Sequence, residues 1–223
     1  MIVFVDGENF RQNLSLELVR QHLIKNRDVA YKYDVVGLMR EALMVDDPDI
    51  WYYASEVKLP KGHEVDDQVL KQVIKIEKKT RRWVPMLKEQ GIKYIKAGNL
   101  KVKMSKPCRH CGESSEIIQE KGVDVRMALD IFEQSLNPSV EEIAVMSSDV
   151  DICPVYQKIR KHWTKVRYVC FADRMNMAIN SACYKTMKIS PRMVKNHFDG
   201  VMLGGEVELF PDDLAIDDYI DEN

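Results

Sequence analysis

The segment IVFVDGEN (Ile2 to Asn9) places an acid and a glycine directly after four apolar residues. A short apolar run that stops in this way is typical of a buried parallel strand that leads into a turn. An acid at the end of such a strand is costly unless it meets solvent, a helix N-terminus or a cation. Three further segments place acids in comparable positions: GVDV (Gly122 to Val125), SSDVD (Ser147 to Asp151) and FADR (Phe171 to Arg174).

Predicted strands and helices alternate along the rest of the chain. Apolar runs predict strands over 2–5, 50–57, 92–96, 143–146 and 166–171, whereas helical periodicity predicts helices over 13–24, 35–43, 65–84, 123–136 and 155–162. Asp34 is the expected N-cap of the second helix, and Pro85 is expected to end or kink the third near Val84. The alternation predicts an α/β fold, a three-layer α/β/α sandwich with a mostly parallel sheet.

A small hairpin excursion is expected near residues 100–120. Leu100 to Met104 and Glu116 to Gln119 flank a turn that contains Cys108-Arg109-His110-Cys111. This Cys-x-x-Cys spacing occurs in zinc knuckles, but a structural zinc needs four ligands, so His63, His197 or a partner chain would have to complete the set. A plain turn with two free thiols is the simpler interpretation, and the odd total of five cysteines favours reduced thiols.

Composition indicates one globular domain and an acidic tail. The chain has 223 residues, of which 45% are hydrophobic and 30% charged, and its formal net charge is -2. Residues 206–223 carry eight acids and no Lys or Arg, which leaves 33 basic and 27 acidic residues, or +6, in the body. We therefore divide the chain into a domain over 1–205 and a tail over 206–223. The tail either keeps the protein in solution or competes with a polyanion for the basic body.

The sequence also bears on location and assembly. No apolar run approaches the roughly 20 residues that a membrane span needs, and the N-terminus lacks the features of a signal peptide. We expect a cytoplasmic protein with no membrane partner. Two-fold symmetric homodimers are common, so a homodimer is among the assemblies that the sequence allows.

Acids from distant parts of the chain are expected at one edge of the sheet. In open α/β sheets the ligand crevice lies beyond the carboxyl ends of the strands. Asp6, Asp149 and Asp173 directly follow predicted strands, so they should share that edge. Asp124 lies at the start of a helix that could lean over the same crevice, and Asp151 follows two residues after Asp149.

Carboxylates that face one another repel, and a divalent cation is their natural complement. An all-oxygen site suits Mg²⁺ or Mn²⁺, which can polarise a phosphate and activate water for phosphodiester hydrolysis. We predict Asp6, Asp124 and Asp149 as metal ligands, with Asp151 in support and Asn9 positioning water or phosphate. Each residue also has an ordinary structural role open to it, because Asp151 and Asn9 could cap helices and Asp173 could be a turn acid.

A basic stripe runs along the third predicted helix. Its members are Lys71, Lys75, Lys78 and Arg82. These cations could follow the phosphate backbone of RNA, although charges at helical spacing also form ordinary solvated faces.

Three of the acidic segments together resemble a known family. FVDGEN, KGVDVRMALD (Lys121 to Asp130) and SSDVDICP (Ser147 to Pro154) resemble, in order and approximate spacing, the signature segments of NYN domains, the LabA-like branch of PIN-like nucleases. The resemblance covers roughly residues 1–185. It implies a Rossmann-like fold and a Mg²⁺- or Mn²⁺-dependent ribonuclease site, with matching positions at Asp6, Asn9, Asp124, Asp149 and Asp151.

The chain departs from the family pattern at two places. Ser148 stands where many relatives have glycine, and Ala182-Cys183-Tyr184 stands where an acid is often expected, so Asp173 is the substitute that strand geometry suggests. The leading hypothesis is a metal-dependent endoribonuclease, and the alternative is an RNA-binding regulatory module with a vestigial site. A phosphatase of the haloacid dehalogenase type would want a second Asp where Glu8 stands.

Overall fold

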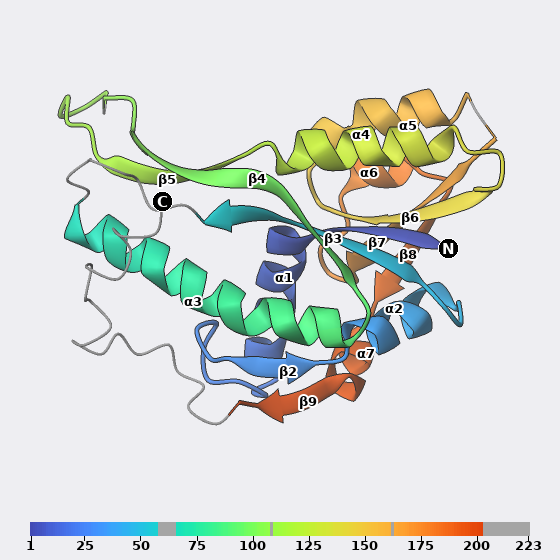
Figure 1. Cartoon of the computed structure of the whole chain (residues 1–223), viewed down its shortest axis with the longest axis horizontal. Coiled ribbons are helices and arrows are strands. Elements are labelled where there is room, and N and C mark those ends of the chain that lie inside the picture. The colour runs from blue at the N-terminus through green and yellow to red at the C-terminus, as the bar shows by residue number, and fades with distance from the viewer. Residues whose placement is uncertain (58–65, 108, 162, 203–223) are drawn as a thin grey trace.

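A seven-stranded sheet forms the centre of the computed structural model, which describes residues 1–57, 66–107, 109–161 and 163–202 (Figure 1). Its strands are β1 (Ile2–Asp6), β3 (Asp49–Val57), β4 (Lys93–Met104), β5 (Glu116–Lys121), β6 (Glu142–Met146), β7 (Lys165–Phe171) and β8 (Lys185–Ile189). They lie in the order β5-β4-β3-β1-β6-β7-β8. Neighbours are parallel except at one edge, where β5 pairs antiparallel with β4. The predicted mostly parallel sheet and its hairpin are confirmed.

Helices cover both faces of this sheet (Figure 1). One face carries α1 (Gly7–Arg20), α2 (Val35–Leu43), α3 (Asp67–Glu89) and α7 (Pro191–Asn196), and the other carries α4 (Val123–Ser135), α5 (Cys153–Ile159) and α6 (Met177–Ala182). A small second sheet pairs β2 (Tyr31–Tyr33) with β9 (Phe198–Val201). The architecture is the expected PIN-like α/β/α fold. None of the helices in the described ranges has the length and apolar character to span a membrane.

Strand β1 explains why two hydrophobic cores exist. It lies between β3 and β6, so both of its edges are hydrogen-bonded. Val3 and Val5 point into the core shared with α1 and α2, whereas Phe4 points into the core shared with α4 and α5. All three side chains are fully buried. Alternate residues of a strand face opposite sides, so a strand covered on both faces must be apolar throughout.

The sequence predicted that Pro85 would end or kink the third helix near Val84, but helix α3 does not end there. It continues to Glu89 with Pro85 inside it. The proline is exposed, whereas its neighbours Trp83, Met86 and Leu87 are buried against the sheet. Burial of apolar side chains on both sides of the proline therefore compensates for the missing backbone hydrogen bond.

Other expectations differ in extent or fall outside the description. Strand β4 is one continuous element, although the sequence suggested two separate segments within it. The short elements β2, β8, β9 and α7 were not predicted. Cys108, His63 and the acidic tail over 206–223 lie outside the described residues, so the zinc and tail interpretations stay predictions.

The turn from β1 into α1 requires a residue without a side chain. A Cβ atom at Gly7 would lie 2.2 Å from Cε1 of Tyr52 and 2.6 Å from the carbonyl oxygen of Tyr53. Tyr52 is buried and donates a hydrogen bond to the Gly7 carbonyl at 2.7 Å, so it has little room to retreat. Strand β3 therefore packs directly on the turn that presents Asp6.

We predict that Gly7→Ala lowers the free energy of unfolding by about 1 to 3 kcal/mol, because the added methyl group overpacks this contact. Helix propensity alone predicts the opposite sign at the first position of α1. Chemical denaturation measures the change, with Gln12→Ala, an exposed position on the same helix, as the control. A Gly7→Ala protein as stable as the wild type would contradict the assigned close approach.

Candidate metal centre

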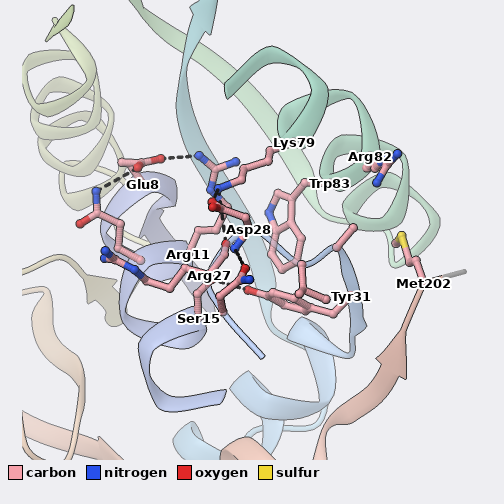
Figure 2. A pocket seen from close by; sticks show the side chains of 14 residues that line it. Glu8, Arg11, Ser15, Arg27, Asp28, Tyr31, Lys79, Arg82, Trp83 and Met202 are labelled. Atoms are coloured by element: carbon pink, nitrogen blue, oxygen red, sulfur yellow. Dashed lines mark hydrogen bonds and ion pairs between the residues drawn. The ribbon is translucent and has the colours of Figure 1, made fainter. Parts of the chain in front are cut away.

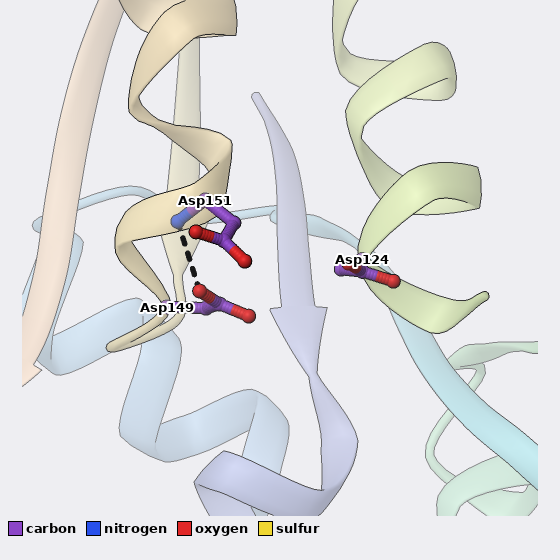
Figure 3. Close-up of side chains that lie close together, drawn as sticks. All are labelled: Asp124, Asp149 and Asp151. Carbon is purple, nitrogen blue, oxygen red and sulfur yellow. Dashed lines mark hydrogen bonds between the residues drawn. The ribbon is translucent and has the colours of Figure 1, made fainter. Parts of the chain in front are cut away.

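Three aspartates from two separate segments come together beyond the end of β1. Asp124 lies in the first turn of α4, and Asp149 and Asp151 lie at the start of the 3₁₀ helix η1 (Val150–Ile152). One carboxylate oxygen of each residue lies within 4.8 Å of those of the other two. Figure 3 shows Asp124 on one side of β1 and the other two aspartates on the opposite side. The sheet topology therefore produces the predicted convergence for these three residues.

Local backbone structure holds each aspartate in place. Asp149 is the N-cap of η1, where its carboxylate accepts a hydrogen bond of 2.9 Å from the Asp151 backbone N–H. Gly122 precedes α4 with a φ of 92°, a left-handed conformation that favours glycine. This glycine lets the chain turn from β5 into α4 within one residue, which brings Asp124 over the edge of the sheet.

Asp6 lies beside this group and is not one of the three. Its two carboxylate oxygens accept hydrogen bonds from the Asn9 backbone N–H at 3.1 Å and from the Ser147 hydroxyl at 3.0 Å. The same Ser147 oxygen accepts the Asp149 backbone N–H at 3.1 Å, so one hydroxyl links the two loops. Burial raises the pKa of the Asp6 carboxyl, and the nearby charges of Asp149 and Glu8 raise it further. Metal ligation by Asp6 stays a prediction.

Asn9 is fixed by polar contacts on the same side of the site. Its side-chain oxygen accepts hydrogen bonds from Asn13 at 2.9 Å and from the Ser148 hydroxyl at 3.0 Å. Ser148 thus has a definite structural role. The Ser148 carbonyl in turn accepts a hydrogen bond of 3.4 Å from Asn176, the N-cap of α6.

Glu120 belongs to the same electrostatic environment and was missed by the sequence reasoning. It lies on β5, and its carboxylate accepts a hydrogen bond of 2.8 Å from the Ser55 hydroxyl. Burial raises the pKa of the Glu120 carboxyl, and the charges of Asp6, Glu8 and Asp124 add to the rise. In the sequence, Glu120 stands out only by lying four residues before Asp124. The antiparallel pairing of β5 with β4 is what brings it near the site.

Asp173 lies elsewhere, despite following β7 directly. Its carboxylate accepts a hydrogen bond of 2.8 Å from Arg20, at the C-terminal end of α1. It is absent from the carboxylate group formed within the described residues. The geometric guess that Asp173 supplies a fourth acid is therefore not supported by its position.

The predicted basic stripe on α3 is divided among different environments. Lys75 pairs with Asp28 at 2.6 Å, and its helical neighbour Lys79 pairs with the same carboxylate at 2.7 Å. Lys71 and Arg82 are exposed, and Lys78 is half-buried. Part of the stripe thus neutralises a loop acid, and RNA binding by these residues stays a prediction.

The donor set of the aspartate group fits a hard divalent cation. Carboxylate oxygens around a single Mg²⁺ lie about 2.1 Å from the ion, and hence up to about 4.2 Å from each other. The three oxygens lie within 4.8 Å of one another, so they are near enough to hold one ion once they move closer together. Asp124 and Asp149 are half-buried and Asp151 is exposed, which leaves one side of the group open to a ligand.

The model of the NYN domain family matches residues 1–190, which contain the whole central sheet and all of the predicted acidic site. A solved structure of a protein of unknown function from Vibrio parahaemolyticus RIMD 2210633 is similar, with a TM-score of 0.48 and 14% identity. That likeness covers 84% of this chain and 91% of the other. A search of curated proteins gave no significant match.

We predict that Glu120→Gln stabilises the metal-free protein. A carboxyl group with a raised pKa destabilises the folded state when ionised, and this penalty disappears as the pH falls through the raised pKa. The neutral amide removes the penalty, so the melting temperature in chelator at pH 7 should rise.

The advantage of Glu120→Gln over the wild type should shrink as the pH is lowered, because the wild-type carboxyl then becomes neutral as well. Thermal melts across this pH series check it, with Glu113→Gln, an exposed position near the hairpin turn, as the control. A stabilisation that is equal at all pH values would rule out the charge-based explanation.

Proposed function

The chain belongs to the NYN domain family, and we propose that it is a metal-dependent ribonuclease that hydrolyses phosphodiester bonds in RNA. Membership supports a nuclease-type fold, and the observation that carries the proposal is the convergence of Asp124, Asp149 and Asp151. The chemistry of three carboxylates points to a hard cation, so we propose Mg²⁺ or Mn²⁺ as the cofactor.

The roles that we propose for the site residues follow from their positions. When bound, the divalent ion supplies Lewis acidity toward a phosphate oxygen and lowers the pKa of water. Asp124, Asp149 and Asp151 hold it, because their oxygens already lie together. Asp6 contributes negative charge beside the group and anchors the Ser147 loop through its hydrogen bond. These carboxylates also repel the phosphate backbone in the absence of a cation, which makes the approach of RNA to this group of acids dependent on the metal.

Asn9 is the proposed positioning residue for water or phosphate. Its side-chain oxygen is occupied by Asn13 and Ser148, so the orientation of the amide is fixed. The amide NH₂ group has two donor hydrogens, which suit a phosphate oxygen or a water molecule. This role follows the predicted one and gives Ser148 a supporting function through Asn9.

We expect Asp149→Asn to abolish cleavage while preserving the fold. Asparagine is as good an N-cap as aspartate, so its oxygen can still accept the Asp151 N–H, whereas the ligand charge is lost. Cleavage of labelled RNAs in Mg²⁺ or Mn²⁺ should fall by about a hundredfold or more, and Mn²⁺ affinity measured by calorimetry should fall with it.

The matched control is Asp173→Asn, the same change at the end of the neighbouring strand β7, where the carboxylate binds Arg20 and not the aspartate group. It should cut RNA as the wild type does. If neither protein cuts any RNA in either metal but both bind RNA, the chain is instead an RNA-binding module with a vestigial site.

A further inference from the structure

A cavity of about 510 Å³ lies between α1, α3 and the segment that leads into β2. Its volume falls within the roughly 300 to 1,000 Å³ that is usual for small-ligand pockets. The cavity is formed by residues of four separate segments, the fourth contributing Met202, and lies outside the aspartate group. Figure 2 shows Arg11 from α1, Lys79 and Trp83 from α3, and Tyr31 from β2 around it.

The charges that line this cavity favour an anion. Four basic side chains and two acidic ones face it, which leaves a net charge of +2: Arg11, Arg27, Lys79 and Arg82 against Glu8 and Asp28. Lys75, which does not line the cavity, shares the Asp28 carboxylate with Lys79, so one acid faces two ammonium groups. Arg27, the residue before Asp28, lines the cavity and is exposed. Guanidinium and ammonium groups in this arrangement suit a phosphate.

The cavity wall formed by Tyr31 and Trp83 is aromatic and uncharged. The two rings contact each other edge to face, with their centres 5.6 Å apart. Their polar ends are already satisfied, because the Tyr31 hydroxyl bonds the Ser15 hydroxyl at 2.9 Å and the Trp83 N–H donates to the Tyr52 hydroxyl at 3.1 Å. Tyr31 is 6% and Trp83 7% exposed, so what they offer a ligand is the small apolar part of each side chain that reaches the cavity, which suits contact with a base or a ribose.

A second, smaller cavity lies beside this one. Its volume is about 180 Å³, and Glu8, Arg11 and Trp83 line both cavities. Glu120 also lines the smaller cavity; burial raises the pKa of its carboxyl, and the charges of Asp6 and Asp124 add to the rise. The smaller cavity thus borders both the basic cavity and the surroundings of the carboxylates.

We propose that the larger cavity is a subsite for one unpaired nucleotide of single-stranded RNA. The phosphate of that nucleotide meets Arg27 and Lys79, and its base or ribose lies against Tyr31 and Trp83. A nucleotide held in a helical duplex is stacked and paired, so it cannot enter a cavity between two helices. The proposal rests on the proposed function only in taking RNA as the ligand.

The test measures RNA binding in chelator, so that neither metal nor cleavage affects the result. The probe is a short labelled single-stranded RNA, and fluorescence anisotropy gives its affinity at several salt concentrations. The cavity variant Arg27→Gln/Lys79→Gln is compared with Arg81→Gln/Lys88→Gln, which removes the same charges from exposed positions of α3 outside the cavity. Melting curves of both variants check that each is folded.

We expect the cavity variant to bind at least about tenfold more weakly at ~0.1 M salt, with a salt slope shallower by about 0.7, because one phosphate is no longer neutralised. The control variant should change affinity less than twofold, and duplex RNA should not distinguish the two variants. Equal weakening by both variants, no weakening by either, or the same discrimination with duplex RNA would overturn the proposal.

Tryptophan fluorescence gives a second readout. Trp83 lines the cavity, so saturating adenosine 5′-monophosphate should change its emission in the wild type and not in the Trp83→Phe variant. A signal that persists in Trp83→Phe would place the nucleotide elsewhere. A wild-type protein that binds RNA but does not cut it would contradict the proposed nuclease activity and not the subsite. Equal cleavage and equal binding by the two double variants would contradict the subsite and not the nuclease activity.

Discussion

Repulsion between carboxylates at the ends of β1 and β6 is the constraint around which the site is arranged. Asp6 and Asp149 end up close together because their strands are adjacent and parallel. Burial is the main cause of the raised pKa of Asp6, and the charge of Asp149 adds to it. The Ser147 hydroxyl joins the two loops: it donates to Asp6 and accepts the Asp149 N–H, so these hydrogen bonds hold the acids in position without neutralising them.

Helix capping contributes to the same result. Asp6 caps α1 and Asp149 caps η1, so each carboxylate is stabilised by backbone N–H groups at a helix start. These interactions fix the direction in which each acid points. They leave the negative charge in place, because backbone donors carry only partial charges. The capping role and the proposed site role of these aspartates are therefore compatible, although among the site residues the sequence had suggested helix caps only for Asp151 and Asn9.

The sequence could predict the elements that depend on local pattern. Apolar runs located β1, β6 and β7, and the acids after β1 and β6 were correctly expected to lie near each other. Three outcomes required tertiary structure. Glu120 reaches the site only because β5 folds back on β4, Asp173 turns away because Arg20 lies within reach, and α3 passes Pro85 because its buried neighbours hold it. None of these contacts leaves a periodic trace in the sequence.

The ion pair between Glu8 and Arg11 separates two regions of opposite charge. The atoms are 2.6 Å apart, and only 18% of the Arg11 side chain is exposed. Although burial opposes ionisation of Glu8, Arg11 and Gln12 lower the pKa of its carboxyl, so it stays charged and pairs with Arg11. A neutralised ion pair thus lies between the negatively charged aspartates and the larger cavity, whose lining is positively charged overall. A polyanion can then be attracted at the cavity by protein charges alone, whereas at the carboxylates it needs a metal ion.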